Sequence, residues 1–182
     1  MLTYEEGWLN GNGVRRVESP NFNQRPKNIA IDVLVIHNIS LPPSRFGSDD
    51  VEMFFTNQLD LSRHPTYDHL KDVKVSAHLY IQRTGQMIQF VSLLDRAWHA
   101  GVSHFQGRNN CNDFSIGIEL EGTDDLPFTD AQYERLIAVT RLIQQQFPLI
   151  TRDHITGHSD IAPDRKTDPG PCFDWSRYKK AL

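Results

Sequence analysis

Several short stretches of the chain carry the hydrophobic patterns of β-strands. Residues 31–37 (IDVLVIH) are β-branched and apolar on both faces, which predicts a central strand covered on both sides. Residues 114–122 (FSIGIELEG) alternate apolar with polar or small residues, which predicts a strand with one polar face. Residues 76–82 and 87–92 flank a Thr-Gly-Gln turn and predict a hairpin, and residues 154–158 (HITGH) predict a short strand.

The clearest helical pattern covers residues 130–147. Thr129 and Gln132 form a capping-box pattern at its start, apolar residues recur at helical spacing, and Pro148 ends it. Residues 174–182 predict a second helix that closes the chain.

These elements together predict an α/β fold, in which α-helices flank a mixed central β-sheet. We expect one domain over residues 1–182, since this length suffices to bury a core and no internal repeat is visible. Residues 40–74 are rich in Pro, Gly and polar clusters around a short predicted helix at 49–59. Such a long irregular segment suggests a lid over a cleft.

Composition narrows the choice of function classes. A formal net charge of −4 argues against a nucleic-acid binder, and no apolar run is long enough to cross a membrane. The first residues do not resemble a signal peptide, and the two cysteines form no C-x-x-C motif, so we expect a cytoplasmic protein with reduced thiols. A monomer is the expected state for a chain of this size.

Two histidines and a cluster of aspartates suggest a metal site. His37 ends the first predicted strand and His158 ends the short strand at 154–158, which places both where sites collect in α/β sheets. Two imidazoles and one carboxylate are typical ligands of a catalytic zinc ion with one open position. The third ligand could be Asp160, Asp164 or Asp168, and His158-Ser159-Asp160 could instead open an iron(II) site of the two-histidine, one-carboxylate type.

Other residues could act beside such a metal. Glu119 and Glu121 are candidate general bases on the polar face of strand 114–122, with Gly117 opening space beside Glu119, although the same pattern fits a solvated strand face. Lys166 could place an ammonium group near a developing oxyanion. Trp98 either lines a cleft or belongs to the core.

Seven motifs, in this order, carry a family resemblance. They are LVIHNISLPP, VSAH, RAWHAGVS, CNDFSIGIELEGTD, FTDAQY, TGHSDIAP and RKTDPGPCFDW. The chain resembles the type 2 N-acetylmuramoyl-L-alanine amidases, a superfamily that includes the peptidoglycan-recognition proteins, from about residue 7 to its C-terminus. The resemblance implies the same mixed sheet with flanking helices.

The resemblance also assigns roles to individual residues. It implies that His37, His158 and Asp168 bind Zn²⁺, and so selects Asp168 among the three aspartates. It implies that Glu119 acts as the general base and that Lys166 stabilises the oxyanion. The site would then be that of a zinc-dependent amide hydrolase.

The implied substrate is a recycled muropeptide, a small molecule. The family branch in question cleaves between the lactyl group of 1,6-anhydro-N-acetylmuramic acid and L-alanine, a step of peptidoglycan recycling that also controls β-lactamase induction. Two alternatives are a lytic amidase of intact peptidoglycan and a non-catalytic peptidoglycan-recognition module. We expect five residues to contact substrate: Asn38, Trp98 and His99 lining the cleft, and Lys74 and Arg165 facing the peptide carboxylates.

Overall fold

A six-stranded mixed sheet in the order β12-β5-β11-β6-β7-β3 forms the centre of the structure, a computed structural model that describes residues 2–182. Strands β12, β5, β11 and β6 run parallel, β7 returns antiparallel to β6, and β3 pairs in parallel with β7. The strands are β1 (Thr3–Glu5), β2 (Trp8–Asn10), β3 (Val14–Arg16), β4 (Phe22–Asn23), β5 (Val33–Ile39), β6 (Leu79–Ile81), β7 (Met87–Gln89), β8 (Arg96–Ala97), β9 (His104–Phe105), β10 (Arg108–Asn109), β11 (Ser115–Glu121) and β12 (Ile155–Gly157).

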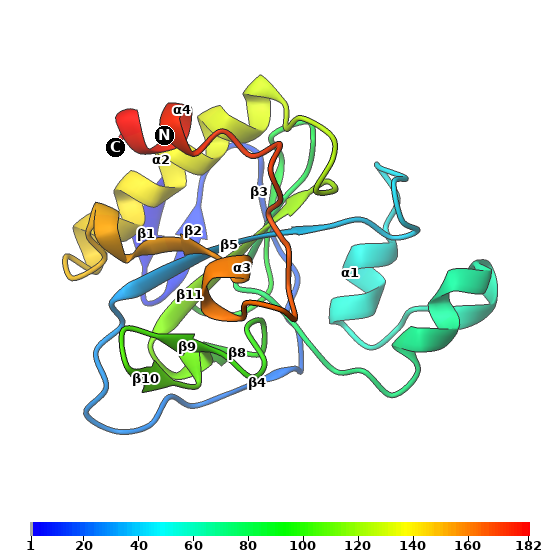
Figure 1. Cartoon of the computed structure of the whole chain (residues 1–182), viewed down its shortest axis with the longest axis horizontal. Coiled ribbons are helices and arrows are strands. Elements are labelled where there is room, and N and C mark those ends of the chain that lie inside the picture. The colour runs from blue at the N-terminus through cyan, green and yellow to red at the C-terminus, as the bar shows by residue number, and fades with distance from the viewer. Residues whose placement is uncertain (1) are drawn as a thin grey trace.

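Helices cover both faces of this sheet. Figure 1 shows α2 and α4 above one face, with both chain ends nearby, whereas α3 and the strands β8–β10 lie on the other side and α1 projects outward. The mixed sheet with flanking helices that the sequence predicts is therefore confirmed. The α-helices are α1 (Asp50–Phe55), α2 (Asp130–Gln146), α3 (His158–Ile161) and α4 (Trp175–Lys180), and the 3-10 segments are Leu61–Arg63, Pro65–Leu70, Cys111–Asp113 and Arg152–His154.

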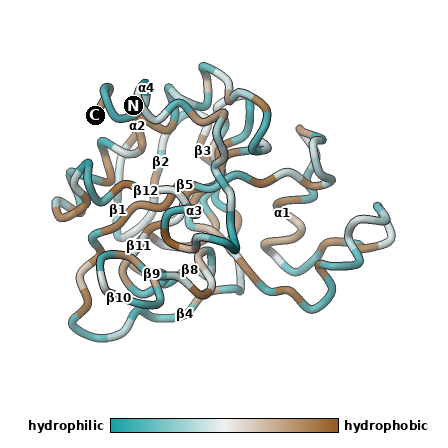
Figure 2. The backbone as a smooth tube through the Cα atoms, viewed as in Figure 1, coloured by the Kyte–Doolittle hydropathy of each residue, from teal (hydrophilic) through white to brown (hydrophobic). Residues whose placement is uncertain are grey.

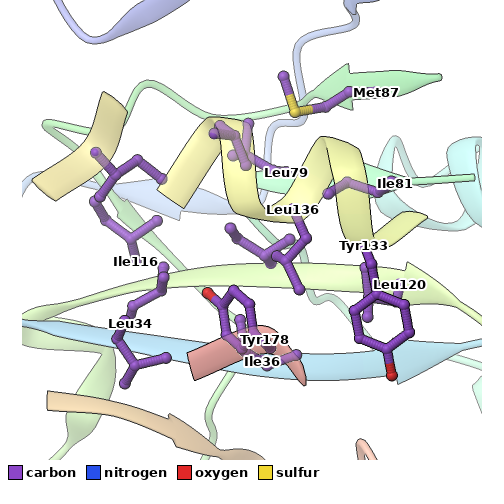
Figure 3. Packing of buried hydrophobic residues seen from close by; sticks show 14 of the residues in the cluster. Leu34, Ile36, Leu79, Ile81, Met87, Ile116, Leu120, Tyr133, Leu136 and Tyr178 are labelled. Atoms are coloured by element: carbon purple, nitrogen blue, oxygen red, sulfur yellow. The ribbon is translucent and has the colours of Figure 1, made fainter. Parts of the chain in front are cut away.

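The core between the sheet and α2 follows from the alternation along the two central strands. Leu34 of β5 and Ile116 of β11 are fully buried and face Leu136 of α2, as Figure 3 shows. Each such side chain contributes about 1.5–3 kcal/mol by leaving water. In Figure 2 the outer loops are mainly hydrophilic and hydrophobic colour recurs in the central strands. The opposite face of these two strands is left free to carry polar groups.

The local signals predict the ends of α2 closely, but they predict longer hairpin strands than the structure has. Both hydrogen bonds of the capping box between Thr129 and Gln132 are present, and α2 ends one residue before Phe147. The strands of the predicted hairpin pair antiparallel but are only three residues long each. The short strands before residue 31 carry no such pattern and were not predicted from the sequence.

The polar face of β11 is buried rather than solvated. All seven residues of Ser115–Glu121 are buried because β5 and β6 pair with β11 on either side and loops cover the face. The alternative that this strand presents a solvated face is therefore wrong, and its glutamates lie in the interior.

A partly buried arginine lies beneath these loops. The Arg25 guanidinium donates to the backbone carbonyls of Asn112, Asp113, Leu93 and Ser115, and lies 3.2 Å from Nε2 of His78. Burial lowers the pKa of Arg25 to about 10, so it remains a cation at neutral pH. It joins the N-terminal segment to the loops that carry the site.

We expect the buried histidines to make the metal-free protein sensitive to acid. Burial, with Arg25 adding its charge, lowers the pKa of His78 to about 3, against about 6.5 in the unfolded chain. Between these values only the unfolded chain binds the proton, so stability is lost as the pH falls from about 6.5 toward 3, at up to about 1.4 kcal/mol per pH unit for each such histidine.

Urea unfolding at several pH values measures this slope. The His78→Asn variant is expected to lose free energy of unfolding less steeply on acidification than the parent protein, because one proton-binding site has been removed. An unchanged slope would contradict the assignment.

Candidate active site

Strand register places a histidine and a glutamate side by side at the centre of the sheet. His37 of β5 and Glu119 of β11 are paired positions, and Tyr80 of β6 pairs with Glu119 on its other side. Neighbours across a parallel pair point to the same face. Both functional side chains therefore leave the sheet on the face opposite α2, and both are buried.

The remaining candidate ligands come from the C-terminal part of the chain. His158 is the first residue of α3 and directly follows β12, which pairs with β5, so it is brought beside His37. A loop then returns Asp168 to the same place, where its carbonyl accepts a hydrogen bond from the Ser159 N–H at 2.9 Å. The two histidines and the aspartate thus meet at one end of the sheet.

Three acceptor-capable atoms converge at this point. Nδ1 of His37 lies 2.9 Å from Nδ1 of His158, and Oδ2 of Asp168 lies 3.1 Å and 3.0 Å from these two nitrogens. In the neutral His158 ring the proton is on Nε2, because Nε2 lies 3.1 Å from the Ala100 carbonyl, which can only accept. A lone pair on Nδ1 of His158 therefore faces the other two atoms.

The charge states favour a cation between them. Burial lowers the pKa of His37 to about 4, so this ring is neutral at pH 7. Burial alone would raise the pKa of Asp168, but its contacts with His158 and His37 outweigh burial and hold that pKa below its usual value. Two imidazole nitrogens and one carboxylate oxygen thus form a buried donor set whose electrostatic balance a metal cation completes.

The spacing fits a small tetrahedral ion. Zinc bonds of about 2.0–2.1 Å place neighbouring ligands about 3.3 Å apart, close to the 2.9–3.1 Å seen here. Among the described residues, the group able to hold a metal consists of these three, which leaves a tetrahedral position open. The set therefore suits a metal that acts on a substrate.

The neighbouring aspartates have other places. Oδ2 of Asp160 accepts hydrogen bonds from the Gly157 N–H and the Thr156 hydroxyl, both at 2.9 Å, and so caps α3. Asp164 is exposed in a turn with a φ of 66°. The iron-type arrangement through Asp160 is not formed, because that carboxylate points to the backbone instead of to His158.

Glu119 is poised for proton transfer. Its Oε2 atom is buried and finds no hydrogen-bond partner among residues 2–182. Burial, and then the negative charge of Asp168, raise the pKa of Glu119 well above its usual value, while the Lys166 ammonium opposes this. An unpaired buried carboxyl beside a metal site is a typical general base and acid.

The other glutamate and the glycine of this strand have structural roles. Glu121 accepts hydrogen bonds from the backbone N–H groups of Gly47 and Arg83, so it ties two loops to the sheet. The sequence suggested that Gly117 opens space beside Glu119, but the space above Gly117 is occupied by His99. A Cβ at Gly117 would lie 2.4 Å from Cγ of His99. The glycine makes room for the imidazole of His99.

A cavity of about 380 Å³ opens onto these groups. Its wall includes apolar residues of the 40–74 segment, such as Leu41, Phe54 and Leu70, so this segment forms one side of the cleft. The sequence-predicted site residues on its lining are Asn38, Trp98, His99, Glu119, His158, Lys166 and Asp168.

The five residues expected to contact substrate differ in their position relative to the cavity. Trp98 is half-buried on the cavity wall, and its indole N–H donates to Oδ1 of Asn23 at 2.7 Å. Asn38 donates to Oδ1 of Asp124 at 2.7 Å, a partner that sequence reasoning missed because nothing local connects the two residues. Lys74 lies in an adjoining hollow of about 210 Å³.

Arg165 and His99 are engaged with the protein itself. Nη2 of Arg165 donates to the carbonyls of Ala100 and Val102, at 2.7 Å each, although the residue is exposed at a polar hollow shared with Asn38 and Lys166. His99 is buried, and its Nδ1 lies 3.0 Å from Nε2 of His37.

This fold and site define a class of enzyme. The sequence profile of the N-acetylmuramoyl-L-alanine amidases matches residues 26–171, and the chain belongs to this family of hydrolases. It is 54% identical over 178 residues to the 1,6-anhydro-N-acetylmuramyl-L-alanine amidase AmpD of Escherichia coli (strain K12), covering 98% of this chain and 96% of that protein.

Solved structures agree with the relationship. A crystal structure of a selenomethionine derivative of AmpD superposes with a TM-score of 0.95 at 50% identity, covering 99% of both chains. A complex of the amidase AmiD from E. coli with anhydro-N-acetylmuramic acid-L-Ala-D-γ-Glu-L-Lys superposes with a TM-score of 0.62 at 27% identity, covering 99% of this chain and 65% of the other.

Proposed function

We propose that this protein hydrolyses the amide bond between the lactyl group of 1,6-anhydro-N-acetylmuramic acid and L-alanine in recycled muropeptides, with Zn²⁺ held by His37, His158 and Asp168. The convergence of these three ligand atoms beside the unpaired Glu119 carboxyl is the observation that carries the proposal. The substrate class comes from the similarity to AmpD over nearly the whole chain and from the muropeptide bound to AmiD.

The chain's own groups can perform each proton step. When bound, zinc supplies Lewis acidity toward a carbonyl oxygen and toward water. Glu119 accepts a proton from the attacking water and delivers one to the leaving amine of L-alanine, for which its raised pKa suits it. Lys166 stabilises the oxyanion that forms on the lactyl carbonyl, since this residue lines the same cavity.

The shape of the site favours catalysis over binding alone. A non-catalytic peptidoglycan-recognition module would need neither a metal with an open position nor a buried unpaired carboxyl. This chain brings together three residues that could hold such a metal and places the unpaired Glu119 carboxyl near them. A lytic amidase of intact wall would carry the same chemistry, so only the substrate distinguishes it. We favour the recycling role because of the 54% identity to AmpD.

Compartment and oligomeric state are further parts of this proposal. No described helix has the length and apolar character needed to span a membrane. We propose the cytoplasm, with support from two unpaired cysteines, Cys111 and Cys172. We propose a monomer, because all five site residues come from one chain. Control of β-lactamase induction would follow from muropeptide removal.

Hydrolysis in H₂¹⁸O tests the proposed bond cleavage. Mass spectrometry of the products from an anhydro-muramoyl tripeptide is expected to show free tripeptide and an anhydro sugar with one ¹⁸O in its lactyl carboxylate. Label in the peptide, or cleavage within the peptide, would rule the proposed reaction out.

Replacing Lys166 by methionine tests the oxyanion role. The length and apolar stem of the side chain are kept but the charge is lost, so kcat is expected to fall by about 100- to 1,000-fold while zinc stays bound. Lys180→Met is the matched control, because it removes the charge of an exposed lysine on α4 that lines neither the cavity nor the polar hollow. A Lys166→Met protein with near-parental kcat would contradict the assigned role.

A further inference from the structure

The loop that carries Trp98 to Gly101 lies directly behind the two metal-binding histidines. His99 Nδ1 lies 3.0 Å from Nε2 of His37, and the next residue, Ala100, receives Nε2 of His158 on its carbonyl at 3.1 Å. Both rings are therefore held, on the nitrogen that faces away from the metal position, by consecutive residues. Such outer contacts fix the tautomer and orientation of histidine ligands.

Only one assignment of donors and acceptors fits the hydrogen bonds around His99. The Ser115 hydroxyl donates to the Cys111 carbonyl at 2.6 Å, so its oxygen is free to accept from Nε2 of His99 at 3.2 Å. With the proton of His99 on Nε2, its Nδ1 carries a lone pair and accepts from Nε2–H of His37. Nδ1 of His37 is then the nitrogen left unprotonated, which is the atom that meets His158 and Asp168.

The surroundings of His99 hold it in this position. The side-chain oxygen of Asn112 accepts from the N–H groups of His99 and Ala100, at 3.1 Å and 2.8 Å, which fixes the loop. The imidazole fills the recess above Gly117, where any Cβ would collide with it. His99 is only 8% exposed, so it offers little surface to a substrate.

We infer that His99 is a positioning residue of the metal site, which orients His37 and fixes its tautomer through a chain from Ser115 to His37. It replaces the substrate contact that the sequence suggested for this residue. The inference rests on the proposed function, because it requires a metal at His37. Asn112 and Gly117 support this role of His99: Asn112 fixes the loop that carries it, and Gly117 leaves room for its imidazole ring.

Zinc affinity of three variants tests the inference. His99→Phe keeps a ring but has no acceptor, and its zinc affinity, measured by competition with a chromophoric chelator, is expected to be about 10- to 100-fold weaker. His99→Asn restores an oxygen near the position of Nδ1 and is expected to recover much of the loss. His78→Asn is the matched control, a buried histidine that bonds the Gly117 N–H and the Asp95 carbonyl, and is expected to keep parental affinity.

A second readout uses the unaltered protein, so it decides the matter even if a variant does not fold. In zinc-loaded, ¹⁵N-labelled protein, a scalar coupling across the hydrogen bond between His37 Nε2 and His99 Nδ1 is expected, with the His99 proton on Nε2. A His99 proton found on Nδ1 would overturn the inference.

The outcomes of these experiments distinguish the positioning role of His99 from the proposed metal site on which it depends. Parental zinc affinity in His99→Phe, or an equal loss in His78→Asn, would overturn the positioning role while the metal site stood. Equal zinc affinity in the parent protein and in His37→Ala would instead overturn the proposed metal site, and this inference with it.

Discussion

Replacing Asp168 by alanine is expected to abolish zinc binding at the site and with it the amidase activity. Asp168 supplies the one negative charge among the three ligands, and its Oδ2 lies about equally close to both histidine nitrogens. Without it, only two imidazole nitrogens remain, and a divalent cation loses both a ligand and charge compensation. Metal content after dialysis and hydrolysis of an anhydro-muropeptide measure the effect.

The neighbouring aspartates provide the controls for this experiment. Asp164→Asn changes an exposed turn residue to one that also tolerates a positive φ, and is expected to retain metal and activity. Asp160→Ala removes the cap of α3 and is expected to lower stability by about 1 kcal/mol without removing the metal. Loss of zinc in the Asp164 variant, or its retention in Asp168→Ala, would contradict the ligand assignment.

Glu119→Gln is expected to lower kcat by about 100- to 10,000-fold, because an amide can neither accept nor return the proton. Zinc content is expected to remain near one ion per chain, since Glu119 is not among the three convergent ligands. The substitution preserves volume and adds no charge to the interior, so the fold is expected to persist. Steady-state kinetics together with metal analysis checks both parts.

Glu121→Gln is the matched control, two residues further along the same strand. Its carboxylate bonds the backbone of Gly47 and Arg83, so the variant is expected to lose stability but to keep kcat within a few-fold. If Glu119→Gln kept parental turnover, another group would have to move the proton.

Local patterns predict the elements that surround the site. Residues 31–37 are apolar on both faces because β5 is covered on both sides, and Thr129 with Gln132 identifies the start of α2. The short N-terminal strands lack such signals: β3 and β4 are defined by pairing with the distant strands β7 and β8, and β1 and β2 form a hairpin of only three residues on each side. Sheet order likewise depends on contacts that no local pattern records.

The proposed metal ligands show how far chemical reasoning from the sequence alone can reach. His37 and His158 stand out by their places beside predicted strands, but three aspartates compete for the third position, and only the family resemblance selects Asp168. The structure places Asp168 in the convergent group because the loop after α3 returns it to His158. Loop paths of this kind are set by tertiary packing.

His99 shows a different case, in which a residue reaches its expected place but also makes a contact that the sequence did not indicate, with Nε2 of His37. Its motif suggested a wall of the cleft, and it does reach that wall. The sequence could not reveal that Gly117, on a separate strand, leaves the recess into which its ring fits. The role of Gly117 follows only when both segments are seen together.

One comparison tests the central claim most directly. Zinc-loaded protein is offered an anhydro-muropeptide in one reaction and intact peptidoglycan in another, each with and without a chelator, and zinc is then restored to the chelated protein. We expect rapid release of peptide from the anhydro-muropeptide only, its loss on chelation and its return with zinc. Preferred cleavage of intact peptidoglycan, or activity that survives complete metal removal, would contradict the account.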